Sequence, residues 1–270
     1  MKKRIISAVV FVLLWVAVLV IDNRWFDTIT VVAISVIAMF EYLRAFRGIG
    51  CKPISWISYL GCLCIILTGG LMPEAYRIMM IKILLPLVLI GAFAYVMLSN
   101  VKRSMKDIAI TILGILYIPF TLSFIKLILA LPYGRFYILF VFCGAFISDT
   151  CAFLVGSKIG KTKLAPDISP NKTVEGSIGG IIGVLIAFII LAIIGRYAFN
   201  INVNIFYWIF VALVAAVAGQ FGDLTESAIK RYCKIKDSGK IMPGHGGVLD
   251  RFDSLMFVAP IVYIFIKLYI

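Results

Sequence analysis

The chain has 270 residues, of which 63% are hydrophobic and only 14% are charged, and its mean hydropathy is +1.08. An average soluble domain is about half apolar and about a quarter charged, so a soluble core could not cover this much apolar surface. The formal net charge of +13 would suggest a nucleic-acid partner in a soluble protein. In a membrane protein the same excess of Lys and Arg holds cytoplasmic loops inside, so we expect no nucleic-acid partner.

Apolar runs of about the length that crosses a bilayer follow one another along the chain. We therefore predict an all-α, polytopic transmembrane protein with nine helices, at 5–21, 25–43, 54–71, 78–98, 108–131, 136–156, 178–195, 203–220 and 254–269. Lys and Arg gather in alternate connections, which places the N-terminus in the cytoplasm. We expect one integral membrane domain, 1–270, in which 1–135 gives little functional information and 136–255 carries the chemistry.

Two of the predicted cytoplasmic connections, 157–177 and 221–253, are long and polar, whereas the others are short. Functional residues concentrate in such connections. The second contains five of the thirteen acids of the chain, and acids contribute little to topology. Carboxylates beside Lys and Arg suit Mg²⁺ together with a polyphosphate, because Mg²⁺ binds through a few carboxylates plus substrate phosphates. The charged residues of this segment are Asp223, Glu226, Lys230, Arg231, Lys234, Lys236, Asp237, Lys240, Asp250, Arg251 and Asp253.

Helical spacing orders part of this segment. If the helix of 203–220 continues, Asp223, Ser227, Lys230 and Arg231 fall on one face. Asp250 lies 27 residues after Asp223, at the start of the next helix, so an antiparallel hairpin would let the two carboxylates meet over one metal ion. Between them, the only histidine of the chain stands among glycines and a proline, in the run Pro-Gly-His-Gly-Gly at 243–247, where the backbone can approach a ligand closely.

The run from Ser227 to Asp253, SAIKRYCKIKDSGKIMPGHGGVLDRFD, resembles the signature of the phosphatidate cytidylyltransferase (CDP-diacylglycerol synthase) family. The matching positions are Ser227, Lys230, Arg231, Lys236, Asp237, Gly239, Pro243, His245, Gly246, Gly247, Asp250, Arg251 and Asp253. The segment at 148–180 is similar to the same family, notably Asp149 and the run Ser-Pro-Asn-Lys-Thr-Val-Glu-Gly at 169–176. The resemblance is strongest from about 140 to 255, and before that only the hydropathy supports it.

The resemblance implies that CTP and phosphatidic acid are the substrates, and that the lipid phosphate attacks the α-phosphorus of CTP while pyrophosphate leaves. We assign Asp223 and Asp250 to Mg²⁺, with Asp253 or Asp237 beside them and room for a second cation. Lys230, Arg231 and Lys236 would hold the triphosphate, and Lys172 would face a phosphate with support from Asp149 and Glu175. The remaining predicted substrate-binding residues are Ser227, His245, Gly246, Gly247 and Arg251.

The same features suggest a bacterial inner membrane protein with its site on the cytoplasmic side, and the resemblance is compatible with a homodimer. Two other interpretations stay open. A CTP-dependent polyprenol kinase also joins a cytidine nucleotide to a membrane lipid, and it would release CDP rather than pyrophosphate. A secondary transporter of an anionic metabolite would explain the many spans, but it predicts a midplane site and an internal repeat, which we do not find in the sequence.

Overall fold

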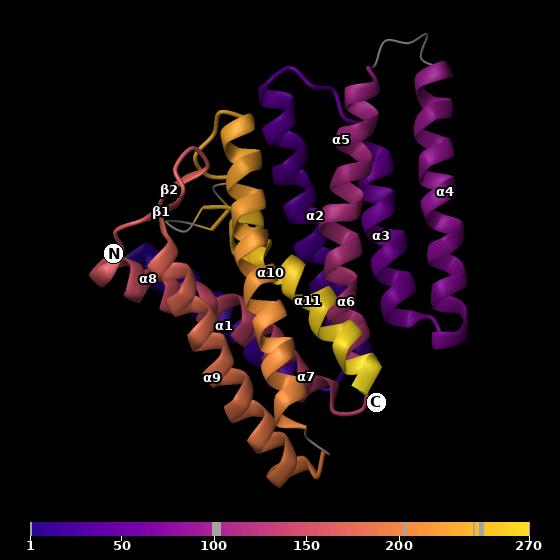
Figure 1. Ribbon diagram of the computed structural model, residues 1–270. Helices are drawn as coiled ribbons and strands as arrows, with labels where there is room; N and C mark the ends of the chain where they lie inside the picture. Colours follow the sequence, from indigo (N-terminus) through magenta and orange to yellow (C-terminus); the bar gives the residue numbers. More distant parts are fainter. Residues whose placement is uncertain (1, 99–103, 202–203, 240, 243–245, 270) are drawn as a thin grey trace. The chain divides into compact units, whose positions relative to one another are not determined.

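The computed structural model describes residues 2–98, 104–201, 204–239, 241–242 and 246–269 (Figure 1). Each of the nine predicted intervals is helical within these residues, although the bounds differ. Among the described residues, six helical segments are long and apolar enough to cross a membrane, and two further apolar helices, Ser55–Leu71 and Lys82–Leu98, are shorter. The chain is therefore a polytopic integral membrane protein, while the count of nine spans stays a prediction.

The chain divides into two compact units, of which the first comprises Met1–Ala130 and Tyr232–Asp250. Its helices are α1 (Lys2–Val20), α2 (Arg24–Gly48), α3 (Ser55–Leu71), α4 (Glu74–Leu98), α5 (Met105–Ile115) and α6 (Thr121–Leu129), with the π-helical turn η1 (Leu116–Phe120) joining the last two. Pro119 lies in η1, where a wider turn accommodates a residue that cannot donate a backbone hydrogen bond.

Caps and close packing define the helices of the first unit. The Asn23 side chain accepts from the first backbone N–H groups of α2, and Ser104 and Asp107 form a capping box on α5. In the core, Gly114 lies against the ring of Tyr42, so that a Cβ there would come within 2.7 Å of the ring. Buried Met39 also packs on this glycine, from the same face of α2.

The second unit comprises Leu131–Arg231 and Arg251–Ile270. It contains α7 (Gly134–Phe142), the π-helical turn η2 (Cys143–Ile147), α8 (Ser148–Ile159), α9 (Val174–Phe199), and most of α10 (Ile205–Tyr232) and α11 (Leu249–Tyr269). Strands β1 (Lys163–Ala165) and β2 (Ser169–Thr173) form an antiparallel hairpin between α8 and α9. The all-α prediction missed this hairpin, because strands of three and five residues are too short to show a period that distinguishes a strand from a loop.

Glycines bring α8 and α9 into close contact. A Cβ on Gly176 would lie 2.7 Å from the carbonyl oxygen of Ala152, and one on Gly180 would lie 2.8 Å from that of Ser148. Small residues allow such backbone approach between membrane helices. Another face of α9 exposes large apolar side chains at helical spacing, as expected for contact with lipid. These side chains are Ile178, Ile182, Ile186, Ile190 and Ile193.

Candidate active site

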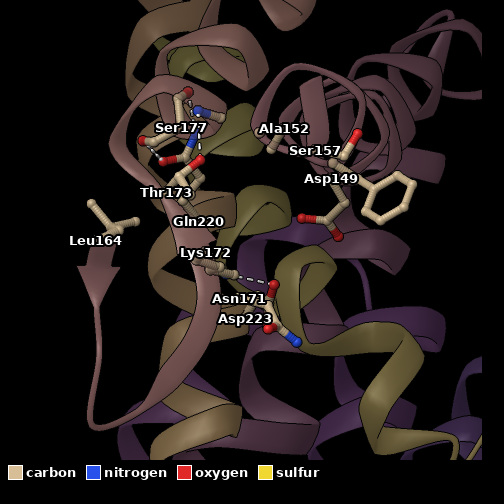
Figure 2. Close-up of a pocket in the computed structure, with 13 residues that line it drawn as sticks. Asp149, Ala152, Ser157, Leu164, Asn171, Lys172, Thr173, Ser177, Gln220 and Asp223 are labelled. Atoms are coloured by element: carbon tan, nitrogen blue, oxygen red, sulfur yellow. Dashed lines mark hydrogen bonds and ion pairs between the residues drawn. The ribbon is translucent and has the colours of Figure 1, made fainter. Parts of the chain in front are cut away.

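A cavity of about 410 Å³ opens within the second unit, between α8, the hairpin, α9 and α10. It lies next to the glycine contacts that hold α8 against α9. Its apolar lining includes Phe153 and Leu164, and Phe153 is also 73% exposed. The polar residues of the lining are Asp149, Ser157, Asn171, Lys172, Thr173, Ser177, Gln220 and Asp223 (Figure 2).

Two sequence-predicted residues, Lys172 and Asp223, form an ion pair in this cavity. Lys172 Nζ lies 2.5 Å from Asp223 Oδ2, as the dashed line in Figure 2 marks. Lys172 is the last residue but one of β2. Thr173 ends the strand, and its hydroxyl caps α9 by accepting from Gly176 N. Ser227, one turn after Asp223 on α10, donates to Asp223 Oδ1 at 3.4 Å. The prediction that Asp223 and Ser227 share a helical face is confirmed, because α10 continues to Tyr232.

Asp253 lies close to Asp223 because α10 and α11 touch at a glycine. A Cβ on Gly222 would lie 2.5 Å from the carbonyl oxygen of Asp253, so only glycine fits. Asp253 is 8% exposed, and its Oδ1 accepts from Ser254 N at 2.7 Å. Its carboxylate lies near enough to Asp223, Glu226 and Asp149 to be repelled by all three. Four acids thus gather around the ends of α8, α10 and α11.

Asp149 is the acid that α8 adds to this group. Its Oδ2 accepts from Ser254 Oγ at 3.4 Å, and it lines the cavity. Lys172 and Arg251 place positive charge near it. The sequence predicted functional roles for Asp149 and Arg251 separately, and the structure places the two in one electrostatic environment.

The cationic residues on α10 already have protein partners. Lys230 pairs with Glu226, one turn before it, and Glu226 is fully buried. Arg231 Nε donates to the carbonyl oxygen of Ile168 at 3.1 Å and so ties the hairpin turn to the end of α10. The prediction that both side chains hold a triphosphate stays a prediction, and in this structure both support the local fold.

Glu175 does not line the cavity. Its carboxylate accepts from the backbone N–H groups of Lys161 and Thr162, at 3.0 and 3.1 Å. The side chain therefore fixes the connection between α8 and β1. Its sequence-predicted support for Lys172 stays a prediction.

The remaining predicted residues that the structure describes lie in the first unit, in the loop before α11 and at Asp250 in the first turn of α11. Asp250 Oδ2 accepts from Ser238 N at 3.0 Å and from Gly247 N at 2.7 Å, so this carboxylate closes the loop. Gly246 adopts φ +87°, a conformation that favours glycine. Lys236 and Asp237 are exposed in the same loop, and His245 lies outside the described residues. Asp223 and Asp250 belong to different units, and their pairing over one ion stays a prediction.

The donors of the second unit fit a hard cation in their chemistry. Carboxylate oxygens are the ligands that Mg²⁺ prefers, and the repulsion among Asp149, Asp223 and Asp253 would fall when a cation binds. The described residues contain no cluster of three or more His, Cys, Asp or Glu side chains arranged to hold a metal ion by themselves.

Sequence reasoning missed residues both at the cavity of the second unit and beside the loop of the first unit. The Ser177 hydroxyl donates to Gln220 Oε1, and Gln220 Nε2 donates to the carbonyl oxygen of Ser177. These two bonds join α10 to α9 at the cavity wall. Gln220 precedes Asp223 by three residues on the predicted helix, so helical spacing could have identified it. Glu41 and Arg44 on α2 contact the loop before α11, but no local pattern connects them with it.

Comparison with known proteins bears directly on this arrangement. The model of the cytidylyltransferase family matches residues 2–269. The chain belongs to the cytidylyltransferase family. The match covers the whole helical array, whereas the resemblance seen in the sequence was strongest in 140–255.

Individual relatives agree with this family assignment. A phosphatidate cytidylyltransferase of Bacillus subtilis (strain 168) is 35% identical, with 100% of this chain and 98% of that protein covered. The phosphatidate cytidylyltransferases of Staphylococcus haemolyticus (strain JCSC1435) and Staphylococcus saprophyticus are each 42% identical over 63% of this chain and 64% of theirs. Membership in the cytidylyltransferase family makes the chain a nucleotidyltransferase.

Proposed function

We propose that this cytidylyltransferase-family member transfers the cytidylyl group of CTP to phosphatidic acid, giving CDP-diacylglycerol and pyrophosphate. The observation that carries the proposal is the Lys172–Asp223 pair in a cavity of membrane helices, within a family of this chemistry. Relatives named for the same reaction support the choice of lipid.

In the proposed reaction, an oxygen of the lipid phosphate forms a bond to the α-phosphorus of CTP. The bond from that phosphorus to the oxygen bridging the β-phosphorus breaks, and pyrophosphate leaves with the electron pair. The nucleophile is already an anion, so the reaction needs no strong general base. Catalysis then depends on positioning and on neutralising phosphate charge. Lys172 is the cation of the cavity suited to this, because a phosphate can replace Asp223 as its partner.

We assign a Mg²⁺ ion to the acids at the ends of α10 and α11. Asp223 would hold it, with Asp253 beside it and Ser227 orienting Asp223. Asp250 keeps the role of metal ligand that its place in the signature gives it, and a second cation can be accommodated. When bound, the ion supplies positive charge to phosphate oxygens. The exposed Lys236 and Asp237, the glycines at 246–247, His245 and Arg251 are proposed to contact the nucleotide.

The lipid substrate fits the surroundings of the cavity. Phe153 and Leu164 line it, and neighbouring Leu154 is half exposed on α8, so acyl chains can stay against apolar surface while the phosphate reaches Lys172. Polar groups at membrane depth are tolerated where they line such a cavity. We further propose the inner membrane of a bacterium, nine spans with the N-terminus inside, a cytoplasmic site built mainly from 136–255, and a homodimer.

A labelling assay tests this function. Purified protein in detergent micelles would be given phosphatidic acid, Mg²⁺ and CTP labelled at the α-phosphate, with and without EDTA. We expect label in a CDP-lipid, release of unlabelled pyrophosphate, and no transfer in EDTA. Consumption of CTP to labelled CDP without lipid label would instead support the kinase. No reaction by folded protein over a range of CTP and metal concentrations would contradict both activities.

A further inference from the structure

A buried acid on α2 holds the start of α11. Glu41 is 0% exposed, and its Oε2 accepts from the backbone N–H of Leu249, the first residue of α11, at 2.8 Å. The first N–H groups of a helix have no partner within the helix and carry partial positive charge. A carboxylate placed there satisfies a buried donor and interacts favourably with the helix dipole.

The loop before α11 is shaped around this carboxylate. A Cβ on Gly239 would lie 1.8 Å from Glu41 Oε1, and one on Gly247 would lie 2.5 Å from Glu41 Oε2. The two glycines therefore let the backbone of the loop close on the acid from two sides. One turn further along α2, Arg44 Nη2 donates to the carbonyl oxygen of Ser238 at 2.9 Å.

The same loop is closed from inside by Asp250, whose Oδ2 accepts from Ser238 N and Gly247 N. Asp250 follows Leu249 directly, so the group that Glu41 holds and the predicted metal ligand are adjacent in the chain. If Leu249 moves, Asp250 moves with it. The loop is thus held by one acid from α2 and by one acid from the first turn of α11.

We infer that Glu41 is a positioning residue of the transfer reaction, which acts by holding the start of α11 and the described loop residues 238–239 and 246–248 beside it, and with them the Asp250 carboxylate. This inference rests on the proposed function, but the contact of Glu41 with the loop can be measured whether or not the chain has that activity. An ionisable residue within a membrane helix is costly and marks function by default, which agrees with such a role. The role needs an acceptor at Oε2 and does not require Glu41 to touch a substrate.

Three variants separate positioning from stability. Glu41→Ala removes the acceptor. Glu41→Gln keeps an oxygen that can accept from Leu249 N. Met39→Ala, two residues earlier and equally buried, removes packing on Gly114 while leaving the loop contacts intact. If Glu41→Ala does not fold, Arg44→Ala tests the same loop from an exposed position.

The first measurement is amide hydrogen exchange of the purified full chain over 233–250. We expect Glu41→Ala to accelerate exchange at Ser238, Gly247 and Leu249, and Glu41→Gln to restore most of the protection. The second is the Mg²⁺ concentration for half-maximal transfer, which should rise about 10- to 100-fold in Glu41→Ala, as for loss of groups that orient metal ligands. The KM for phosphatidic acid should stay unchanged.

The controls decide the outcome. Met39→Ala should lower the thermal midpoint without changing loop exchange or the Mg²⁺ requirement. Wild-type exchange in Glu41→Ala, or an equal effect of Met39→Ala, would overturn the inference. If the wild-type chain itself transfers no cytidylyl group, the proposed function fails, while the exchange data still decide whether Glu41 fixes the loop.

Discussion

Lys172 Nζ and Asp223 Oδ2 lie 2.5 Å apart across the cavity, one from the hairpin and the other from α10. Both groups are about three-quarters buried, at 24% and 25% exposure, so each is held by the other when no substrate is present. In the proposed reaction, a phosphate that binds Lys172 would release Asp223 for a cation. This ion pair would then couple the binding of the anion to that of the cation.

The first prediction concerns Lys172. Lys172→Ala should lower kcat/KM by about 10²- to 10³-fold, the usual effect of removing one group that stabilises developing charge. Lys163→Ala is the matched control, because this exposed lysine lies on the other strand of the hairpin and outside the cavity lining. The labelling assay with CTP measures both. An equal fall in kcat/KM in the two variants would show that Lys172 contributes only as one positive charge of the hairpin surface.

Asp223→Asn tests the metal site. The amide keeps the size and the bond from Ser227 but loses the charge that attracts a cation, so we expect transfer near background. Asp167→Asn, at an exposed turn of the same unit, should keep wild-type activity. Titration with Mg²⁺, together with circular dichroism for folding, checks the result. Near-normal turnover of folded Asp223→Asn would contradict the assignment of this residue to the metal.

Gly222→Ala tests the contact between α10 and α11. The new methyl would meet the Asp253 backbone, so we expect a loss of about 1–3 kcal/mol in stability together with lower activity. At Gly91 in α4, a Cβ meets nothing within 4 Å, and Gly91→Ala should stabilise by about 0.5–1 kcal/mol. Thermal unfolding in detergent measures both. If Gly222→Ala has the stability and activity of the wild type, then α10 and α11 can move apart at this contact without loss of stability.

The proposed topology can be tested by cysteine labelling in intact cells of a cysteine-free background. Tyr133→Cys should react with a membrane-impermeant maleimide from outside, because the connection before α7 is predicted to be external and Tyr133 is 53% exposed. Lys163→Cys should react only after permeabilisation. The reverse pattern would place the N-terminus and the hairpin outside.

Much of the fold follows from the sequence because a spanning helix must be long and apolar. Helical spacing also predicted that Ser227 and Asp223 share a face of the helix, and in the structure these neighbours are hydrogen-bonded. The ends of the helices were less predictable. Hydropathy placed the end of one helix at 220, but α10 continues to Tyr232, because charged residues on one face do not end a helix.

Contacts distant in sequence were not predictable. Lys230 seemed free for a phosphate, yet it pairs with the buried Glu226, and whether a nearby acid points inward depends on packing rather than spacing. Glu41 lies in a predicted span with no motif around it, and its partner is Leu249. The backbone N–H of Leu249 makes this bond, and a bond from a backbone group leaves no pattern in the sequence.

The bond from Leu249 to Glu41 also sets an order of events during biosynthesis. The two residues are 208 positions apart, and ribosomes add about 5–20 residues per second, so α2 waits roughly 10 to 40 s for its partner. Throughout that time Glu41 lacks the backbone N–H of Leu249, which is its partner in the folded protein. The bond that holds the loop before α11 therefore forms only after Leu249 has been synthesised.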